Sequence, residues 1–221
     1  MQTGSVKGLS PREQRKVCVC LTRIWENKNK ENKMYELGRF FIDQQGNMIE
    51  GCLPENNMQR FSDKLKESLL YEISSFIVVA ARNSYRVAEH AFRIKIGQQT
   101  KIREIDPPLE DFPFYAYNAK PFDTLEKRMK ETNVLSDVIG IAFKVTEVLT
   151  SKSGHESRRH IFIKNESDRT AVVTLWGELA ESFNARSLYE ASIEKNVPVL
   201  FMGMVVDYFS GAYLLYIYSS M

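Results

Sequence analysis

The chain repeats one arrangement of strands and a helix, and this repeat most constrains how it can fold. In the first half, period-2 alternation of apolar and polar residues predicts strands over Val17–Trp25, Met34–Ile42 and Met48–Leu53. Helical spacing follows within Asn57–Leu70. Two further strands are expected to follow the helix, Tyr71–Ala81 and Tyr85–Ile96, around a short turn. The first half therefore predicts three strands, one helix and two strands.

The second half shows the same order of elements, displaced by about 120 residues. Its expected elements are strands over Asp137–Leu149, Arg159–Lys164 and Thr170–Trp176, a helix within Glu178–Glu194, and strands over Val197–Asp207 and Ala212–Tyr218. The hairpin cores Phe40–Ile42 and Ile161–Ile163 occupy matching places, so the two halves indicate a duplication. Five strands with a helix between the third and the fourth fit the OB barrel, whereas an immunoglobulin sandwich has about seven strands. We therefore predict a mainly β chain of two tandem five-stranded OB-fold barrels, each with a helix between strands 3 and 4.

A segment rich in proline separates the two halves. Four prolines and a charged stretch, Asp123–Glu131, fall within residues 105–133. Proline disfavours both helix interiors and central strands, so this segment is expected to be a linker with one short helix. The first OB-fold domain is then expected over residues 1–104 and the second over residues 134–221.

The charge balance predicts that any nucleic-acid site is local, with a few basic residues, and does not extend over a uniformly basic surface. The net charge is only +2, from 30 Lys and Arg against 28 Asp and Glu, which is unlike a polycation that covers nucleic acid. Hydrophobic residues make up 43% of the chain, which is enough for packed cores. No apolar run approaches the ~18 residues of a membrane-spanning helix, so no membrane partner is expected.

The cysteines and histidines predict neither a metal nor an enzyme. Cys18 and Cys20 alternate with valines and Cys52 stands alone, which is typical of buried reduced thiols. None of the three histidines has a cysteine or carboxylate at metal-ligand spacing. Phosphate-binding glycine loops and nucleophile elbows are also missing, so we expect no cofactor, no metal and no catalysis.

Five short motifs, in the same order along the chain, resemble the large subunit of replication protein A. They are Phe41–Asp43 leading into Gly46, Tyr85–Val87, Asp137–Ile141, Arg158–Lys164 and Thr174–Glu178. The Arg-Ile-Trp-Glu sequence of the first strand is similar to plant replication-factor-A-like proteins. The likeness covers about residues 10 to 218. It implies tandem OB barrels that bind single-stranded DNA, without the N-terminal protein-binding barrel and the zinc-bearing barrel of the full subunit.

The resemblance implies which aromatic residues stack on bases. Trp176 ends the third strand of the second barrel, at the family's stacking position, with a core tryptophan as the alternative. Tyr208 or Phe209 stands at the tip of the loop between strands 4 and 5, and Tyr85 begins the fifth strand of the first barrel. A stacking aromatic is usual near the end of the third strand of the first barrel, where Leu53 stands here. Packing in the core is the alternative for Tyr85.

The basic candidates surround the groove that an OB barrel forms across strands 2 and 3. In both barrels they lie mainly in or beside the loops that flank this groove, and a plain solvated surface is the alternative for each lysine. The candidates are Lys28, Lys30, Lys33, Arg39, Arg82 and Arg86 in the first half, and Lys152, Arg158 and Arg159 in the second. Phosphate contacts carry no sequence information, so weak sequence preference is expected.

Two functions remain open from the sequence. The first is binding of single-stranded DNA in replication, repair or recombination, in the nucleus, with other replication protein A-like subunits or repair proteins as possible partners. The second is a protein–protein interaction scaffold, because OB barrels also serve that purpose and a fold does not fix a function. The preference for DNA over RNA depends on the resemblance alone.

Overall fold

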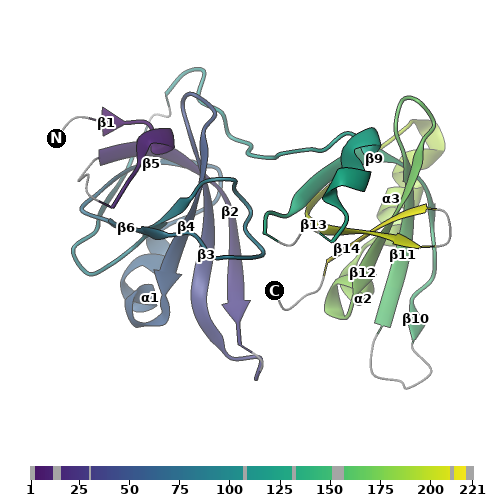
Figure 1. The fold of residues 1–221 in the computed structure, drawn as a ribbon, viewed down its shortest axis with the longest axis horizontal. Coiled ribbons are helices and arrows are strands. Elements are labelled where there is room, and N and C mark those ends of the chain that lie inside the picture. Colours follow the sequence, from purple (N-terminus) through teal and green to yellow (C-terminus); the bar gives the residue numbers. More distant parts are fainter. Residues whose placement is uncertain are drawn as a thin grey trace. The chain divides into compact units, whose positions relative to one another are not determined.

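The computed structural model describes residues 3–11, 16–29, 31–106, 109–130, 133–150, 157–209 and 212–217. Within these ranges, the side chains of residues 194, 209, 212–214 and 217 are not described. The chain forms two compact units, Met1–Ala116 and Tyr117–Met221 (Figure 1). Both units are built mainly of β-strands.

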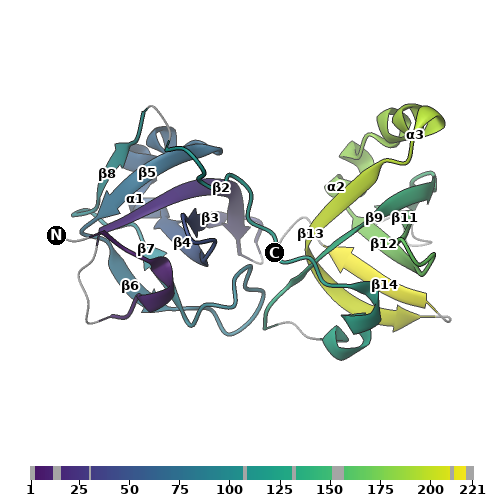
Figure 2. The same cartoon turned by 90° about the horizontal axis from the view of Figure 1, so that it is seen from above.

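The first unit is a strongly curled sheet with one α-helix. Its elements are β1 (Thr3–Gly4), η1 (Val6–Gly8), β2 (Lys16–Lys28), β3 (Met34–Asp43), β4 (Met48–Pro54), α1 (Glu55–Phe61), η2 (Ser62–Lys64), β5 (Leu69–Ser74), β6 (Ile77–Ala80), β7 (Phe92–Lys95) and β8 (Lys101–Glu104). The strands run in the order β6-β7-β4-β3-β2-β5-β8, with β1 paired to β2. Only Ser75 and Phe76 separate β5 from β6, which lie near opposite ends of this order. The sheet must therefore curl back on itself into a half-barrel, as Figure 2 also shows.

The second unit is a closed five-stranded barrel. Its elements are η3 (Phe122–Arg128), β9 (Ser136–Val145), β10 (Leu149–Thr150), β11 (Ser157–Lys164), β12 (Thr170–Trp176), α2 (Glu178–Ser182), α3 (Ala185–Glu194), β13 (Pro198–Phe209) and β14 (Ala212–Ile217). Closure comes from β9, which pairs with both β11 and β13, while β12 and β14 pair in parallel. The predicted fold class, tandem OB barrels with a helix between strands 3 and 4, is confirmed.

Alternation along each strand fills the two barrel interiors. In the first unit Leu21, Phe41 and Ile49 are fully buried in one apolar cluster. In the second, Ile161 and Val173 occupy the corresponding cluster. Matching hairpins of the duplicated halves thus supply matching cores, which is the arrangement that the internal repeat predicts.

The segment between the two predicted domains packs onto both units. Phe112 and Ala116 are buried in a cluster that also contains Phe40, on the outside of the first unit. Phe122 and Leu125, in η3, belong to the interior cluster of the second unit. The apolar side chains within residues 105–133 therefore pack onto an apolar cluster of one unit or the other. The boundary between the two units falls between Ala116 and Tyr117.

One predicted strand is replaced in part by a loop. The strand expected over Tyr85–Ile96 is formed only by β7, and residues 81–91 connect β6 to β7 irregularly. Tyr85 has a φ of 55°, which an extended strand does not allow. Val87 and Ala88, whose apolar character suggested a strand, instead pack against the outside of the sheet. No helix among the described residues is long and apolar enough to cross a membrane.

The turn between β3 and β4 anchors the N-terminal segment through Asp43. This side chain is 2% exposed, and its Oδ2 accepts hydrogen bonds from Ser5 Oγ at 2.7 Å and from the Val6 backbone N at 3.0 Å. Its Oδ1 accepts from the backbone N of Gln45 at 3.0 Å and of Asn47 at 2.8 Å. One carboxylate therefore holds both the turn and the chain that precedes β2.

Replacing Asp43 with alanine is expected to destabilise the first unit by ~2–4 kcal/mol, because one buried donor and several partly buried donors lose their acceptor. Urea unfolding followed by circular dichroism measures this loss. Gln44→Ala is the control, since the Gln44 side chain is exposed in the same turn. Equal stability of the two variants would contradict the anchoring role of Asp43.

Candidate nucleic-acid interface

The outer face of β11 and β12 in the second barrel carries an aromatic and basic group of side chains. Inward-facing positions of β11 are buried, with Ile161 and Ile163 at 0% exposure. The alternate residues, Arg158, His160 and Phe162, therefore face outward. This face corresponds to strands 2 and 3 of an OB barrel, where oligonucleotides bind in this fold class.

Trp176 lies on this outer face, directly across from Arg158. The two residues are cross-strand partners, and the Arg158 guanidinium carbon is 6.0 Å from the centroid of the Trp176 ring. Trp176 is partly exposed and Arg158 is exposed. An indole and a guanidinium side by side offer a planar surface and a positive charge to a ligand that has flat rings and phosphates.

A polar pair follows Trp176 along the same face. His160 lies opposite Thr174, with 2.9 Å between His160 Nδ1 and Thr174 Oγ1. Burial, and secondarily the charge of Arg158, lower the pKa of His160 below its usual value. A neutral imidazole at pH 7 can donate or accept a hydrogen bond at the edge of a base.

Aromatic residues extend the face onto β9. Phe162 packs against Phe143, with ring centroids 6.2 Å apart, and the Lys144 Nζ is 5.1 Å from the Phe162 ring. A shift of register between β11 and β9 at this point leaves both Phe143 and Lys144 exposed. The outer face therefore continues from Trp176 to Phe143 with two basic residues beside it.

The loop candidates of the second barrel are only partly described. Tyr208, near the end of β13, is 51% exposed, and its backbone pairs with that of Tyr213. The side chain of Phe209 and the whole of Lys152 lie outside the described part of the chain, as does Lys30 of the first barrel. Among these candidates, only Tyr208 has a described side chain at the rim of the groove.

In the first barrel the outer face carries Trp25, which the sequence patterns did not single out. Trp25 pairs with Gly38 of β3, and a Cβ placed on Gly38 would lie 2.0 Å from Trp25 Cε2. The indole therefore lies over the bare backbone of Gly38. Its Nε1 donates to Asn27 Oδ1 at 3.1 Å, and the Arg23 guanidinium carbon is 5.7 Å from the ring centroid. A tryptophan paired with a glycine across two strands was the signal that could have revealed this platform.

A buried network of charged residues surrounds the Trp25 platform. Arg82 Nη2 lies 3.1 Å from Glu50 Oε1, and Arg93 Nη1 lies 2.9 Å from Glu36 Oε1. Arg82 Nη1 and the Asn27 amide link the two pairs, since the former donates to Asn27 Oδ1 and the latter to Glu36. Burial raises the pKa of Glu50, and the charges of Arg82 and Arg93 partly oppose that rise.

The basic candidates of the loop between strands 4 and 5 already have partners within the first unit. Arg82 also donates to the Tyr85 carbonyl at 3.4 Å, and Arg86 donates to the His90 carbonyl at 3.3 Å. Tyr85 itself is 41% exposed on this loop. Of the loop lysines, Lys28 pairs with Glu26 at 3.1 Å. Lys33 is exposed.

Three side chains considered for the groove lie elsewhere. Arg39 is 1% exposed and faces the interior of the first barrel, because it shares the inward phase of Phe41. Burial lowers its pKa to about 10, with an opposing effect from Glu67. Arg159 is 9% exposed and also faces inward, so it cannot join Arg158 in the groove. Leu53 is fully buried in the core and therefore does not occupy a groove position.

The described residues form no cluster of three or more metal-ligating side chains. The thiols are free, with Cys20 and Cys52 buried. Burial raises the pKa of Cys20 to about 11, and burial together with nearby carboxylates raises that of Cys52 to about 12. Such thiols stay protonated near pH 7, when they are poor nucleophiles and poor ligands.

The fold and this outward-facing group of side chains are those of a tandem OB-fold protein with an aromatic, basic groove. Residues 8–127 match the domain of unknown function DUF223, and residues 123–221 match the replication protein A OB domain. The chain belongs to the family of the DUF223 domain, which matches more than half of it, and its second part is similar to the replication protein A OB domain.

Several curated relatives and one solved structure to which the chain is similar are replication protein A proteins. The replication protein A 70 kDa DNA-binding subunit of Xenopus tropicalis is 25% identical over 166 residues, 73% of this chain and 26% of that protein. A replication protein A 70 kDa DNA-binding subunit of Oryza sativa subsp. japonica is 26% identical over 194 residues, 86% of this chain and 20% of that protein. A replication protein A heterotrimer bound to ssDNA has the same fold, with a TM-score of 0.62 and 24% identity over 98% of this chain and 50% of that one. The chain spans about a quarter of the length of the curated relatives it matches.

Replacing Gly38 with alanine is expected to push the Trp25 indole off β3 and shift its fluorescence to longer wavelength. The same change is expected to cost ~1–3 kcal/mol of stability through overpacking. Emission spectra in a Trp176→Phe background measure Trp25 alone, because the chain has two tryptophans. Gly97→Ala is the matched control, since a Cβ there would meet only Ile77 Cδ1 at an ordinary 3.5 Å. An unshifted spectrum would show that the indole does not lie over Gly38.

Proposed function

We propose that this protein binds single-stranded DNA with little sequence preference, mainly by stacking bases on Trp176 and Trp25. The pairing of Trp176 with Arg158 on the outer face of β11 and β12 is the observation that carries the proposal. Aromatic platforms suit any base, because every base has a flat face, and a neighbouring guanidinium suits the phosphate. Tyr208, Phe162 and Lys144 extend the surface that the strand would follow.

Stacking is proposed to contribute more to the binding free energy than attraction between basic side chains and phosphates. Each stacked base contributes ~1–3 kcal/mol, so two or three platforms supply ~2–9 kcal/mol. Electrostatic attraction to phosphates needs basic side chains that are not already paired. In the first barrel Arg82 and Arg93 are held by Glu36 and Glu50, which lie on the same face. The second barrel, with Arg158 and Lys144 exposed, is therefore proposed as the stronger binding half.

The biological setting is also a proposal. The relatives are named as DNA-binding subunits of replication protein A, and the matched structure is a heterotrimer bound to ssDNA. We propose that this chain likewise acts in the nucleus, in replication, repair or recombination, with other replication protein A-like subunits as partners. Its role is binding and not catalysis.

Trp176→Ala is expected to weaken binding to oligo-dT by at least ~5-fold, and Trp25→Ala by less, because each loses a stacking platform. Fluorescence anisotropy with labelled oligo-dT at ~50 and ~200 mM salt measures this loss and the salt dependence. Tyr115→Ala is the control variant, since Tyr115 is a highly exposed aromatic residue outside the strands that carry the two tryptophans.

Duplex DNA and oligo-U of the same length complete the experiment. Binding to oligo-dT without binding to the duplex supports the stacking groove, and equal binding to oligo-U would remove the preference for DNA. If oligo-dT does not bind at ~50 mM salt, where phosphate contacts are strongest, the proposal fails and the protein-scaffold function becomes the leading one.

A further inference from the structure

The duplicated barrels carry a buried arginine at the same place, and its surroundings differ between them. Arg39 in β3 and Arg159 in β11 both precede the inward-facing core residue of their hairpin, Phe41 and Ile161, by two positions. Each donates one Nη1 hydrogen bond to a backbone carbonyl, that of Gly38 and that of Phe183. The Nε of each has no hydrogen-bond partner among the described residues.

Arg39 is enclosed, whereas Arg159 opens onto a cavity. Arg39 is 1% exposed. Burial lowers its pKa to about 10, and the negative charge of Glu67 opposes that decrease. Arg159 is 9% exposed and lines a cavity of about 550 Å³. No described carboxylate lies within ion-pair distance of Arg159. Both barrels therefore contain a buried guanidinium without a described ion pair, and that of the second barrel lines a cavity.

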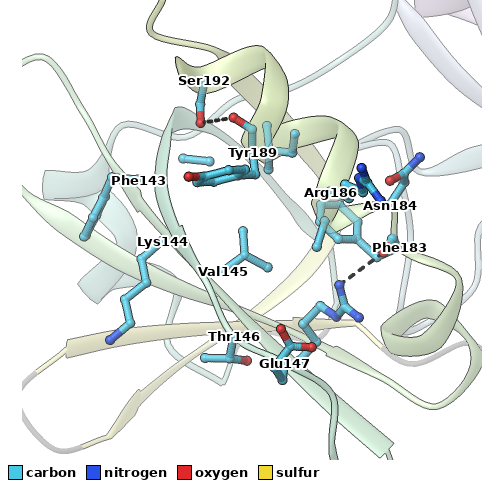
Figure 3. Close-up of a pocket in the computed structure, with 14 residues that line it drawn as sticks. Phe143, Lys144, Val145, Thr146, Glu147, Phe183, Asn184, Arg186, Tyr189 and Ser192 are labelled. Carbon is cyan, nitrogen blue, oxygen red and sulfur yellow. Dashed lines mark hydrogen bonds between the residues drawn. The ribbon is translucent and has the colours of Figure 1, made fainter. Parts of the chain in front are cut away.

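The cavity exists because α3 packs loosely. The helices that directly follow the third strand of each barrel pack on the sheet, since α1 buries Asn57 and Phe61 and α2 buries Ala180. None of the described side chains of α3 is buried, and Leu188 is only partly so. Figure 3 shows the gap that results, with Tyr189 and Ser192 of α3 on one side and the residues from Phe143 to Glu147, at the end of β9, on the other. We call this gap the α3 pocket.

The rim of the α3 pocket is apolar and continues beyond it. Tyr189 and Ile193 are each 67% exposed, although they lie one turn apart on the same helix face. Phe143, across the pocket, is 51% exposed. An opening with a buried cation at its base and aromatic side chains at its edge fits a ligand with a carboxylate beside an apolar group.

We propose that the α3 pocket binds an acidic segment of a partner protein, with one Asp or Glu accepting a hydrogen bond from the Arg159 guanidinium. An aromatic or aliphatic side chain next to that carboxylate would pack between Tyr189 and Phe143. The exposed apolar stripe that continues along α3 suits a peptide, which is longer than the cavity. The lining carries charges of both signs, Lys144 and Arg159 against Glu147. The apolar stripe, and not the charge, therefore favours a peptide over a nucleic-acid strand.

The test uses the full chain and a short labelled peptide in which Asp and Glu alternate with Phe and Leu. Binding measured by fluorescence anisotropy is expected to weaken about tenfold in Arg159→Gln, because a charge-assisted hydrogen bond is lost. A similar loss is expected in Tyr189→Ser, which changes an exposed residue and leaves the fold intact. Amide chemical shifts in labelled protein are expected to move for residues 183–192 and 142–147.

Matched controls separate this site from the groove. A peptide with Asn and Gln in place of Asp and Glu is expected not to bind, and Tyr115→Ser and Trp176→Ala are expected to bind the acidic peptide normally. Oligo-dT is expected to leave the amides of α3 unmoved, although Phe143 and Lys144 border both surfaces. The proposal is overturned if the acidic peptide does not bind, if it moves the amides around Trp176 instead, or if oligo-dT occupies the pocket. Because none of these readouts requires oligo-dT to bind, failure of the DNA proposal would leave this one standing.

Discussion

Closure of the sheet into a barrel is the constraint on which the other features depend, because it assigns every strand residue to the inside or the outside. In β11 the inward phase contains Arg159, Ile161 and Ile163, and the outward phase contains Arg158 and His160. A shift of the strand register by one residue would exchange the two sets, so that the side chains of the groove would be buried and those of the core exposed. The apolar core therefore fixes the position of the binding face as firmly as it fixes the fold. β3 obeys the same rule, with Phe41 inside and Phe40 outside.

Sequence patterns predicted the order of elements well because alternation and duplication are local signals. The same alternation places Trp176 and Arg158 on one face, and the structure agrees. It also implies that Arg158 and Arg159 cannot share a face, so choosing both as groove residues overlooked a signal that was present in the sequence. Arg39 shows the remaining difficulty, since a charged residue in the interior is rare and only its phase relative to Phe41 indicates it.

Other features could not be predicted because they depend on contacts between distant segments. Val87 and Ala88 have the composition of a strand, yet their apolar surface is buried against the outer cluster that contains Phe40. Phe112 similarly lies in a proline-containing segment whose composition is typical of a linker, but it packs on that same cluster. A local pattern indicates that such residues are buried, and only the tertiary structure shows against what.

The two barrels use matching positions for different purposes. In the first, the outer face is occupied by ion pairs that fix the loop of Arg82 and orient Asn27, which in turn holds the Trp25 indole. Removing one member of a buried pair costs ~3–5 kcal/mol, so these arginines are not released cheaply to a phosphate. In the second, Arg158 lies exposed beside Trp176. A chain with a net charge of +2 can thus contain a preorganised aromatic platform in one half and an accessible cation in the other. Local geometry, more than total charge, then decides what each half can bind.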